Sequence, residues 1–198
     1  MLIVVEGKSD EEFLMQYMLY KKIDISFKTI QNDSNGLNNA TVTKIKKGLD
    51  DSRKVYIVFD ADKSYDETLK RIKKQLKKQL GDSADTIGIF LFPNNKDSGE
   101  LETLLIDIAK QPQFIECFDN YVECVKSKDI DNINVVNNIN KKSKIFAYRE
   151  VSGLEKYLKK LKDDDKTPKN FLATNEVFSE YFDFNSPKLE PLRRFLCK

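Results

Sequence analysis

Four short apolar runs, each followed by a helical pattern, constrain the fold of this chain more than any other feature of its sequence. The runs at residues 2–5, 54–59 and 86–92 are compact, and the one at 23–30 alternates in part between apolar and polar residues. Compact apolar runs of this length are typical of strands that are buried on both faces of a sheet. Strands that alternate with helices form parallel sheets, because a parallel connection needs a crossover. The sequence therefore predicts an α/β fold with a central parallel sheet and helices on both faces.

The helical segments between these runs have recognisable starts and stops. Ser9, with Glu12 three residues later, predicts the capped start of the first helix. A second amphipathic helix is expected from Tyr65 to Leu80, capped by Ser64 and stopped by Gly81. Further helices are expected near residues 42–49, 100–109 and 113–126.

The regular pattern weakens after residue 126, which suggests a division of the chain into two parts. Residues 1–126 are expected to form the α/β domain, and residues 127–198 a loop and helical extension packed on that same domain. Within the extension, the Asn-rich segment 128–144 reads as an exposed loop, 145–161 as one helix, and 163–169 as a charged linker. Short helices are expected to finish the chain, with Phe195 and Leu196 docked on the body.

Composition excludes several kinds of chemistry. The chain has no histidine, which rules out a Ser-His-Asp triad, a Cys-His dyad and any His-ligated metal. Its three cysteines form no CxxC pair, so we expect buried or inert thiols in a reducing compartment. No apolar run approaches the roughly 20 residues that span a bilayer, and no signal peptide is evident, so a cytoplasmic location without membrane contact is expected.

Acidic side chains follow two of the predicted strands. Glu6 comes directly after the first strand, and Asp60 and Asp62 follow the third. Carboxyl ends of parallel strands meet at one edge of a sheet, and residues two apart on an extended chain share a face. Crowded carboxylates repel each other unless a cation neutralises them, and carboxylates favour hard cations, so Mg²⁺ or Mn²⁺ is expected here. Taken singly, each motif is better explained by a capping or turn role, and only their matching strand-end positions together favour a metal site.

The motifs that carry these acids resemble the TOPRIM domain, a Rossmann-like α/β fold. The string IVVEGKSD (residues 3–10), followed by VFDAD (58–62), is similar to the acidic motifs of type IA topoisomerases, bacterial primases, OLD-type nucleases and ribosomal-RNA maturation nucleases. The segments GIFLFPNNKDSGELETLL (88–105) and FDFNSPKLEPLRRFL (182–196) resemble a set of stand-alone bacterial TOPRIM-like proteins of unknown function that are related to the OLD nucleases. The resemblance covers nearly the whole chain.

This resemblance implies roles for individual residues. Glu6 corresponds to the TOPRIM glutamate, a metal ligand or general acid/base, and Asp60 and Asp62 to the residues that hold Mg²⁺. Asp10 corresponds to an acid that joins a second metal site in nuclease-type members. Either Glu100 or Glu102 is expected to complete that second site, although acids in a first helical turn also complement the helix dipole. Gly7 allows close backbone approach in the turn, and Lys8 and Lys96 are candidate phosphate contacts.

Two basic groups are candidate surfaces for nucleic acid. Six cations line the helix from Tyr65 to Leu80, and a second group lies between residues 141 and 160. Such patches can neutralise backbone phosphates, but solvated helix faces have the same composition. The net charge of only +2 does not decide between the two interpretations.

Three functions remain open at this point. The resemblance favours Mg²⁺-dependent phosphodiester chemistry on DNA or RNA, most simply a nuclease; the length and the lack of a nucleophilic tyrosine in a recognisable context disfavour a topoisomerase. A module that binds metal and nucleic acid or a nucleotide without turnover, in a phage-defence assembly for example, is the alternative. A receiver-like phospho-acceptor with Asp60 or Asp62 as acceptor is a third. The oligomeric state stays open, with a homodimer as one option.

Overall fold

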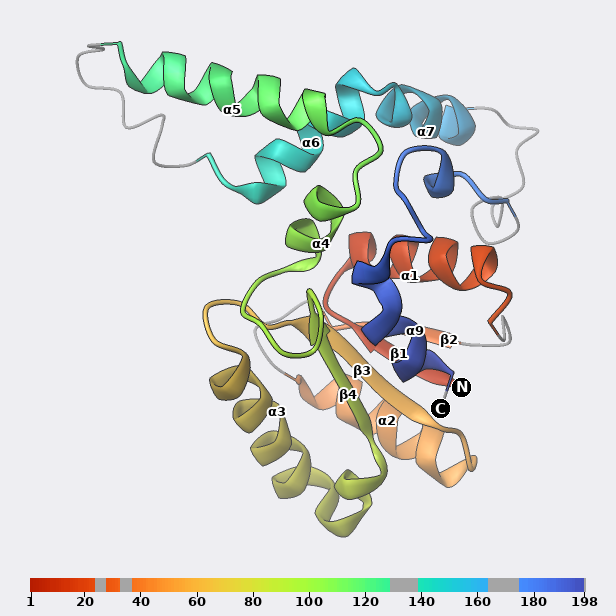
Figure 1. Ribbon diagram of the computed structural model, residues 1–198. Helices are drawn as coiled ribbons and strands as arrows, with labels where there is room; N and C mark the ends of the chain where they lie inside the picture. Colours follow the sequence, from red (N-terminus) through yellow and green to blue (C-terminus); the bar gives the residue numbers. More distant parts are fainter. Residues whose placement is uncertain (24–27, 33–36, 129–138, 164–174, 198) are drawn as a thin grey trace.

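A computed structural model of the chain describes residues 1–23, 28–32, 37–128, 139–163 and 175–197. Its centre is a parallel sheet in the order β2-β1-β3-β4, so the predicted α/β fold is confirmed (Figure 1). The first strand coincides with its apolar run, the other three are shorter than or shifted from theirs, and the last residue of the third strand is Asp60 itself. The strands are β1 (Leu2–Val5), β2 (Lys28–Gln31), β3 (Val55–Asp60) and β4 (Gly88–Phe92).

Two helices cover one face of the sheet. They are α2 (Asn39–Asp50) and α3 (Tyr65–Leu80), and they pack on the strand residues that alternate toward them, such as Val4 and Ile57. The predicted ends of α3 are confirmed: Ser64 Oγ accepts a hydrogen bond from the Glu67 amide at 3.4 Å, and Gly81 stops the helix. Because strand side chains alternate, the other half of each strand is left for the opposite face.

The opposite face is covered by α1 (Lys8–Tyr20), α4 (Leu101–Asp107) and α9 (Glu190–Leu196). Its core is rich in aromatic rings, which meet edge to face as their quadrupoles favour. Phe13 of α1 contacts Phe92 of β4 and Phe184 of the C-terminal segment in this way, with ring centroids 5.9 and 5.8 Å apart. Helices therefore lie on both faces of the sheet, as the sequence predicts.

The first helix begins earlier than expected. Its N-cap is Gly7, not Ser9, and the side chain of Asp10 accepts a hydrogen bond from the Gly7 amide at 2.8 Å. The aspartate thus satisfies a free N–H group at the helix start, a role that the sequence pattern assigned to Ser9 and Glu12. This earlier start brings Asp10 to the end of β1.

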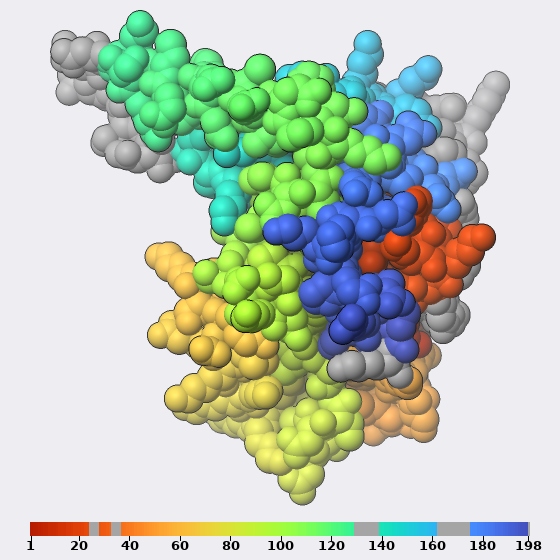
Figure 2. Space-filling view, in the orientation of Figure 1, coloured from red at the N-terminus to blue at the C-terminus, as the bar shows by residue number. Residues whose placement is uncertain are grey.

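The extension contains more helix than the sequence pattern indicates. Helix α5 (Pro112–Lys126) projects from the body (Figures 1 and 2), and it packs against α6 (Lys141–Val151). The prediction of a loop over 128–144 is wrong at its C-terminal end, because α6 begins at Lys141. The N-cap of this helix is Asn140, whose side chain accepts a hydrogen bond from the Ser143 amide. Residues 129–138 of the predicted loop lie outside the described residues. The single helix expected over 145–161 is two helices, because Gly153, with φ of +86°, separates α6 from α7 (Leu154–Asp163). Most of the expected linker, 164–169, also lies outside the described residues.

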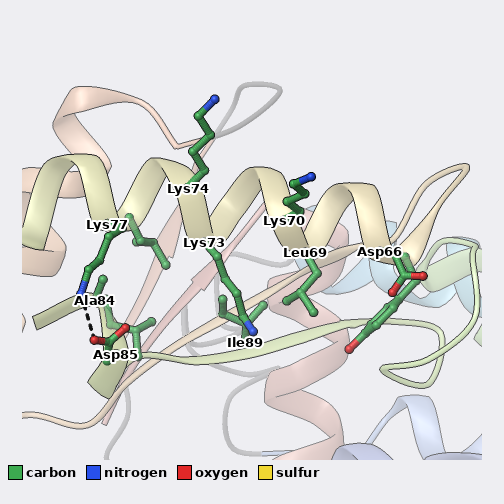
Figure 3. A pocket seen from close by; sticks show the side chains of 12 residues that line it. Asp66, Leu69, Lys70, Lys73, Lys74, Lys77, Ala84, Asp85 and Ile89 are labelled. Carbon is green, nitrogen blue, oxygen red and sulfur yellow. Dashed lines mark hydrogen bonds and ion pairs between the residues drawn. The ribbon is translucent and has the colours of Figure 1, made fainter. Parts of the chain in front are cut away.

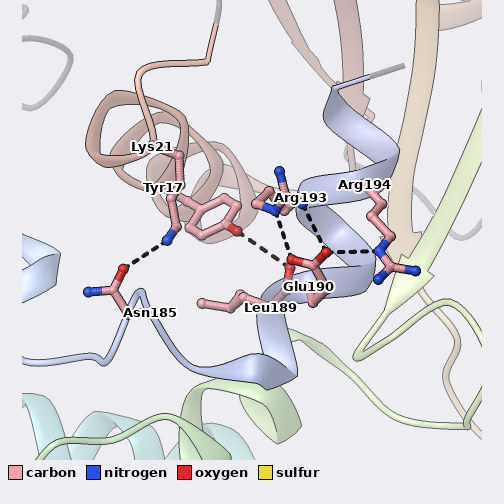
Figure 4. Close-up of polar contacts among 7 residues, drawn as sticks. All are labelled: Tyr17, Lys21, Asn185, Leu189, Glu190, Arg193 and Arg194. Carbon is pink, nitrogen blue, oxygen red and sulfur yellow. Dashed lines mark hydrogen bonds and ion pairs between the residues drawn. The ribbon is translucent and has the colours of Figure 1, made fainter.

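Residues 175–197 return to α1 and close the core. Short turns at Phe178–Glu180 and Pro187–Leu189 lead into α9, and Phe195 and Leu196 are buried as predicted. Figure 4 shows part of this contact: the Tyr17 hydroxyl donates to the Leu189 carbonyl at 3.4 Å, and Lys21 donates to Asn185 at 2.9 Å.

A buried glutamine ties the C-terminal segment to α1. Gln16 is 1% exposed, and its Oε1 accepts from the amides of Val177 and Phe178 at 2.6 and 2.9 Å. We expect Gln16→Leu to lower the free energy of unfolding by about 2–4 kcal/mol, because it leaves two buried amides without an acceptor. Urea denaturation measures this. Gln113→Leu on the exposed surface of α5 is the matched control, expected within about 0.5 kcal/mol of wild type; equal effects of the two changes would contradict the tether.

The three cysteine thiols lie at the surface of the protein. Cys117, Cys124 and Cys197 are all exposed, so the expected burial of the thiols is wrong: the first two lie on the solvent side of α5, and the third follows α9 at the surface. No helix in the described part of the chain is both long and apolar enough to cross a membrane.

Candidate functional site

The central strands β1 and β3 bring the sequence-predicted acids to one edge of the sheet. The two strands pair in parallel with Val5 opposite Val58, so Glu6 follows β1 at nearly the level where β3 ends in Asp60. Helix α1 starts just after Glu6, and α4 starts beside the end of β3. The site is therefore built from two strand ends and two helix starts, the position where open α/β sheets carry their functional residues.

Asp60 is the most enclosed of these acids. It is 9% exposed, and its Oδ1 accepts a hydrogen bond from the Leu101 amide at the start of α4 at 2.8 Å. Burial is the main cause that raises the pKa of Asp60 to about 8, and the charges of Asp10 and Glu6 add to it, while the Leu101 amide acts in the opposite direction. The Leu101 amide thus holds the carboxylate in place, but it does not offset the effect of burial and of the two neighbouring negative charges.

Glu6 lies half-buried beside it. Burial raises the pKa of Glu6 to about 7, and the charges of Asp62 and Asp10 raise it further. A backbone hydrogen bond from Asp60 and the charge of Arg71 lower it. Glu6 therefore changes its charge near neutral pH.

Asp10 joins the same group from the first turn of α1. It is 8% exposed, and burial raises its pKa to about 6 despite the hydrogen bond from the Gly7 amide. The charge of Glu102 raises the pKa of Asp10, whereas Lys142 lowers it. Asp10 is thus close enough to interact electrostatically with Glu102 of α4 and Lys142 of α6.

Asp62 lies differently from the sequence expectation. The strand ends at Asp60, and Asp62 has φ of +54°, so the two acids do not share one face of an extended chain. Gly99 fixes this bend, because its amide and carbonyl both pair with the backbone of Asp62, at 2.8 and 2.9 Å. The side chain is 54% exposed and lies 3.8 Å from Arg71, at the rim of the site.

The two glutamates near α4 differ in position. Glu100 is the N-cap residue and Glu102 lies in the first turn. The charge of Glu102 raises the pKa of both buried aspartates, Asp10 and Asp60. Both glutamates raise the pKa of Lys142, Glu102 more strongly than Glu100. Glu102 is the one that belongs with the buried acids.

The candidate phosphate contacts are less closely associated with the acids. Lys8 is largely exposed and lies 3.9 Å from Glu12 on the same helix, and Lys96 is exposed in the turn after β4. Gly7 has φ of −144°, which any residue adopts, and a Cβ there would come no closer than 3.7 Å to Asp10. Gly7 contributes to the site through its amide, which donates to Asp10, and not through the absence of a side chain.

Sequence reasoning overlooked the cations that face the acids. Lys142 at the start of α6 has a raised pKa. The charge of Glu102 is the main cause, and the charges of Asp60, Glu100 and Asp10 add to it, whereas burial lowers the pKa. Its neighbour Lys141 donates to Thr103 of α4 at 2.8 Å. No motif pointed to Lys142, because it lies in a segment that reads as loop; its only signal was membership of a basic group.

An open cleft of about 650 Å³ lies at the rim of the site, and the buried acids Glu6, Asp10 and Asp60 are not among its lining residues. Asp62, Glu100, Arg71 and Lys141 line it together with residues of the loop before α3 and its first turns. In the described part of the chain, no three acidic or thiol side chains are arranged so that they could hold a metal ion. The donor chemistry nevertheless fits a hard cation, since the buried groups are carboxylates whose raised pKa values reflect burial and mutual repulsion.

The fold and the site define an α/β protein with a doubly covered parallel sheet and a carboxylate cluster at its strand ends. By sequence, residues 1–198 match the family described as "Protein of unknown function (DUF3226)", and the chain belongs to this family. Neither the curated proteins nor the solved structures give a match.

Proposed function

We propose that the chain carries out Mg²⁺- or Mn²⁺-dependent phosphodiester chemistry on nucleic acid, most simply hydrolysis. The observation that carries the proposal is the cluster of Glu6, Asp10 and Asp60, three carboxylates that are buried or half-buried and have raised pKa values. Uncompensated carboxylates at this depth cost folding free energy, which a bound cation would offset. The TOPRIM-like order of the motifs supports the same conclusion.

The carboxylates divide into two groups by position. Glu6, Asp60 and Asp62 would hold one cation, and Asp10 and Glu102 would contribute to a second. Binding would require rotation of these side chains, and Asp62 would exchange its contact with Arg71 for the ion. When bound, such a cation activates water and stabilises the charge that develops on the phosphate oxygens.

The remaining groups of the site suit binding and proton transfer. Lys142, Lys141 and Arg71 place positive charge around the acids, where a backbone phosphate would otherwise be repelled. Glu6, if it does not bind the ion, has a pKa of about 7, which suits a general acid or base near neutral pH. DNA and RNA both satisfy this chemistry.

Cleavage of labelled DNA and RNA in Mg²⁺ or Mn²⁺ tests the proposal. We expect Glu6→Gln to lower the cleavage rate at least about 100-fold, because it removes both a ligand charge and a proton acceptor. Glu116→Gln on the exposed surface of α5 is the matched control and is expected to cleave like wild type. Equal rates for wild type and Glu6→Gln would reject the assignment.

A binding module without turnover is the second candidate, within a phage-defence assembly for example. The observation behind it is the positive charge of Lys141, Lys142 and Arg71 beside the acids, which would bind a phosphate backbone whether or not it is cleaved. Metal-dependent retention of an oligonucleotide without any cleavage product would support it.

In the phospho-acceptor alternative, Asp60 fits poorly as the acceptor, because it is buried and accepts a hydrogen bond from the Leu101 amide. Asp62 is exposed, and failure of the protein to take up phosphate from acetyl phosphate would dismiss the alternative for both residues.

A further inference from the structure

A groove runs between α3 and the outer edge of β4, away from the acidic site. It has a volume of about 910 Å³, and Figure 3 shows Leu69, Lys73 and Ile89 along it. Its floor is apolar and only partly covered: Tyr65, Leu69, Ala84 and Ile89 are half-buried side chains at the margin of the core. The groove therefore joins an exposed sheet edge to a helix face.

The edge of β4 is closed at both ends and open in the middle. Asn95 caps one end, since its side chain accepts from the Leu91 amide at 3.0 Å and its amide donates to the Leu91 carbonyl at 2.7 Å. At the other end, the Ile87 amide donates to Ala84. Strand residues alternate their polar groups, so the N–H and C=O of Ile89 also point outward. Within the described part of the chain, these two groups have no hydrogen-bond partner.

The rim of the groove carries an excess of positive charge, with Asp66 as the acid that it exposes beside the lysines. Lys70, Lys73 and Lys74 are exposed, and none of them forms an ion pair within the described residues. Lys77, by contrast, lies 2.8 Å from Asp82 and 3.0 Å from Asp85. The free cations thus follow α3 along the groove, and Lys73 points toward Ile89, where the strand edge is open (Figure 3).

We propose that this groove binds an extended, acidic segment of a partner protein, with apolar side chains on the floor and carboxylates toward the three lysines. The backbone of such a segment would pair with Ile89 as a short added strand. Residues 66–77 span about 16 Å along the α3 axis, which corresponds to roughly five residues of extended chain. The inference does not depend on the proposed catalytic activity.

Charge and floor chemistry select this partner over two others. A second copy of the chain meeting β4 edge to edge would bring six free lysines together, which like-charge repulsion opposes. Nucleic acid satisfies the lysines, but it leaves the aliphatic floor and the Ile89 backbone without a partner. A strand with alternating acidic and apolar residues satisfies all three features.

Chemical-shift mapping on the ¹⁵N-labelled full chain tests the proposal. The probes are an eight-residue peptide of alternating Asp and Ile, the same peptide with Lys in place of Asp, and an eight-nucleotide single-stranded DNA. We expect the acidic peptide to shift the amides of Lys73, Lys77 and Ile87–Ile89 saturably, and the lysine peptide and the DNA to leave these amides unchanged. At these groove amides, shifts produced by the DNA alone, equal binding of the lysine peptide, or no binding of the acidic peptide would each overturn the proposal.

Two triple variants with the same change in net charge separate the effect of the groove lysines from the effect of overall charge. Lys70, Lys73 and Lys74 changed together to Glu are expected to weaken the acidic peptide at least about tenfold. The same change at Lys44, Lys46 and Lys47, which are exposed on α2, is the matched control and is expected to alter binding less than about twofold. If the first variant unfolds, the change of the three lysines to Gln replaces it. Equal binding by the two variants would contradict the groove as the site.

Discussion

Asp60→Asn is expected to make the metal-free protein more stable while it abolishes metal-dependent activity. The amide has nearly the same shape as the carboxylate, and its oxygen can keep the hydrogen bond from the Leu101 amide. It removes a buried charge whose pKa is raised from 3.8 to about 8. At pH 8 in a chelator, we expect the free energy of unfolding to rise by about 2–4 kcal/mol, because the buried charge is removed. The rise is no larger because burying the N–H groups of the new amide has a cost of its own.

Two measurements on the same variant check this expectation. Urea denaturation in a chelator at pH 8 gives the stability, and cleavage of labelled nucleic acid in Mg²⁺ gives the activity, which we expect to fall at least about 100-fold. Asp107→Asn is the matched control, since Asp107 is 44% exposed and lies 3.5 Å from Lys188; its stability should stay within about 0.5 kcal/mol of wild type. A loss of more than about 1 kcal/mol in Asp60→Asn would contradict a repelled carboxylate.

The stability of the metal-free protein is expected to fall as the pH rises from about 5 to 8. Glu6, Asp10 and Asp60 have folded pKa values of about 7, 6 and 8, above their ordinary values of 4.5, 3.8 and 3.8. In this window the folded state binds more protons than the unfolded state, so the contribution of these groups to stability is present at low pH and is lost as they ionise. Each group contributes up to about 1.4 kcal/mol per pH unit between its two pKa values.

The same linkage makes stabilisation by Mg²⁺ pH-dependent. A cation competes with protons for the three carboxylates, so it binds best once they are ionised. At a concentration about 100 times the dissociation constant at pH 8, we expect Mg²⁺ to stabilise the protein by about 2.7 kcal/mol, which raises Tm by roughly 5–10 °C. At pH 5 we expect a rise of less than about 2 °C.

Thermal melts in chelator and in Mg²⁺ across this range measure both effects. Glu190 does not confuse the result, because its arginine partners lower its pKa to about 2, and its contribution is lost only below about pH 4.5. Asp60→Asn should flatten the pH dependence and remove the Mg²⁺ shift. A stability that rises between pH 5 and 8 without metal, or an Mg²⁺ shift that is equal at both ends, would contradict the carboxylate cluster.

The sheet and its main helices were predictable because their signals are local. The apolar runs that became β1, β3 and β4 have no polar interruption, and α3 carries a serine cap, an apolar stripe and a terminal glycine. The proximity of Glu6 and Asp60 followed from topology alone, since the ends of neighbouring parallel strands meet. These features depend on residues that lie close together in the sequence or on a rule that holds for the whole fold class.

The parts that sequence did not predict depend on distant partners. The bend at Asp62 is fixed by Gly99, and the start of α1 at Gly7 is fixed by the side chain of Asp10, so neither follows from the strand or cap pattern alone. Lys142 meets the acids only because α6 packs on α4, and the polar sequence before Ile145 gives no sign of that contact. Burial, which raises the pKa values of the acids, is likewise a property of the assembled fold.

Anomalous scattering from crystals soaked in Mn²⁺ tests the central claim most directly. The account predicts an ion at the ends of β1 and β3, within about 2.0–2.3 Å of a carboxylate oxygen from both Glu6 and Asp60, with Asp62 turned away from Arg71 toward it. The same crystals of Asp60→Asn should lack that peak. A soaked crystal that shows no ion between Glu6 and Asp60, while other acids of the chain hold Mn²⁺, would contradict it.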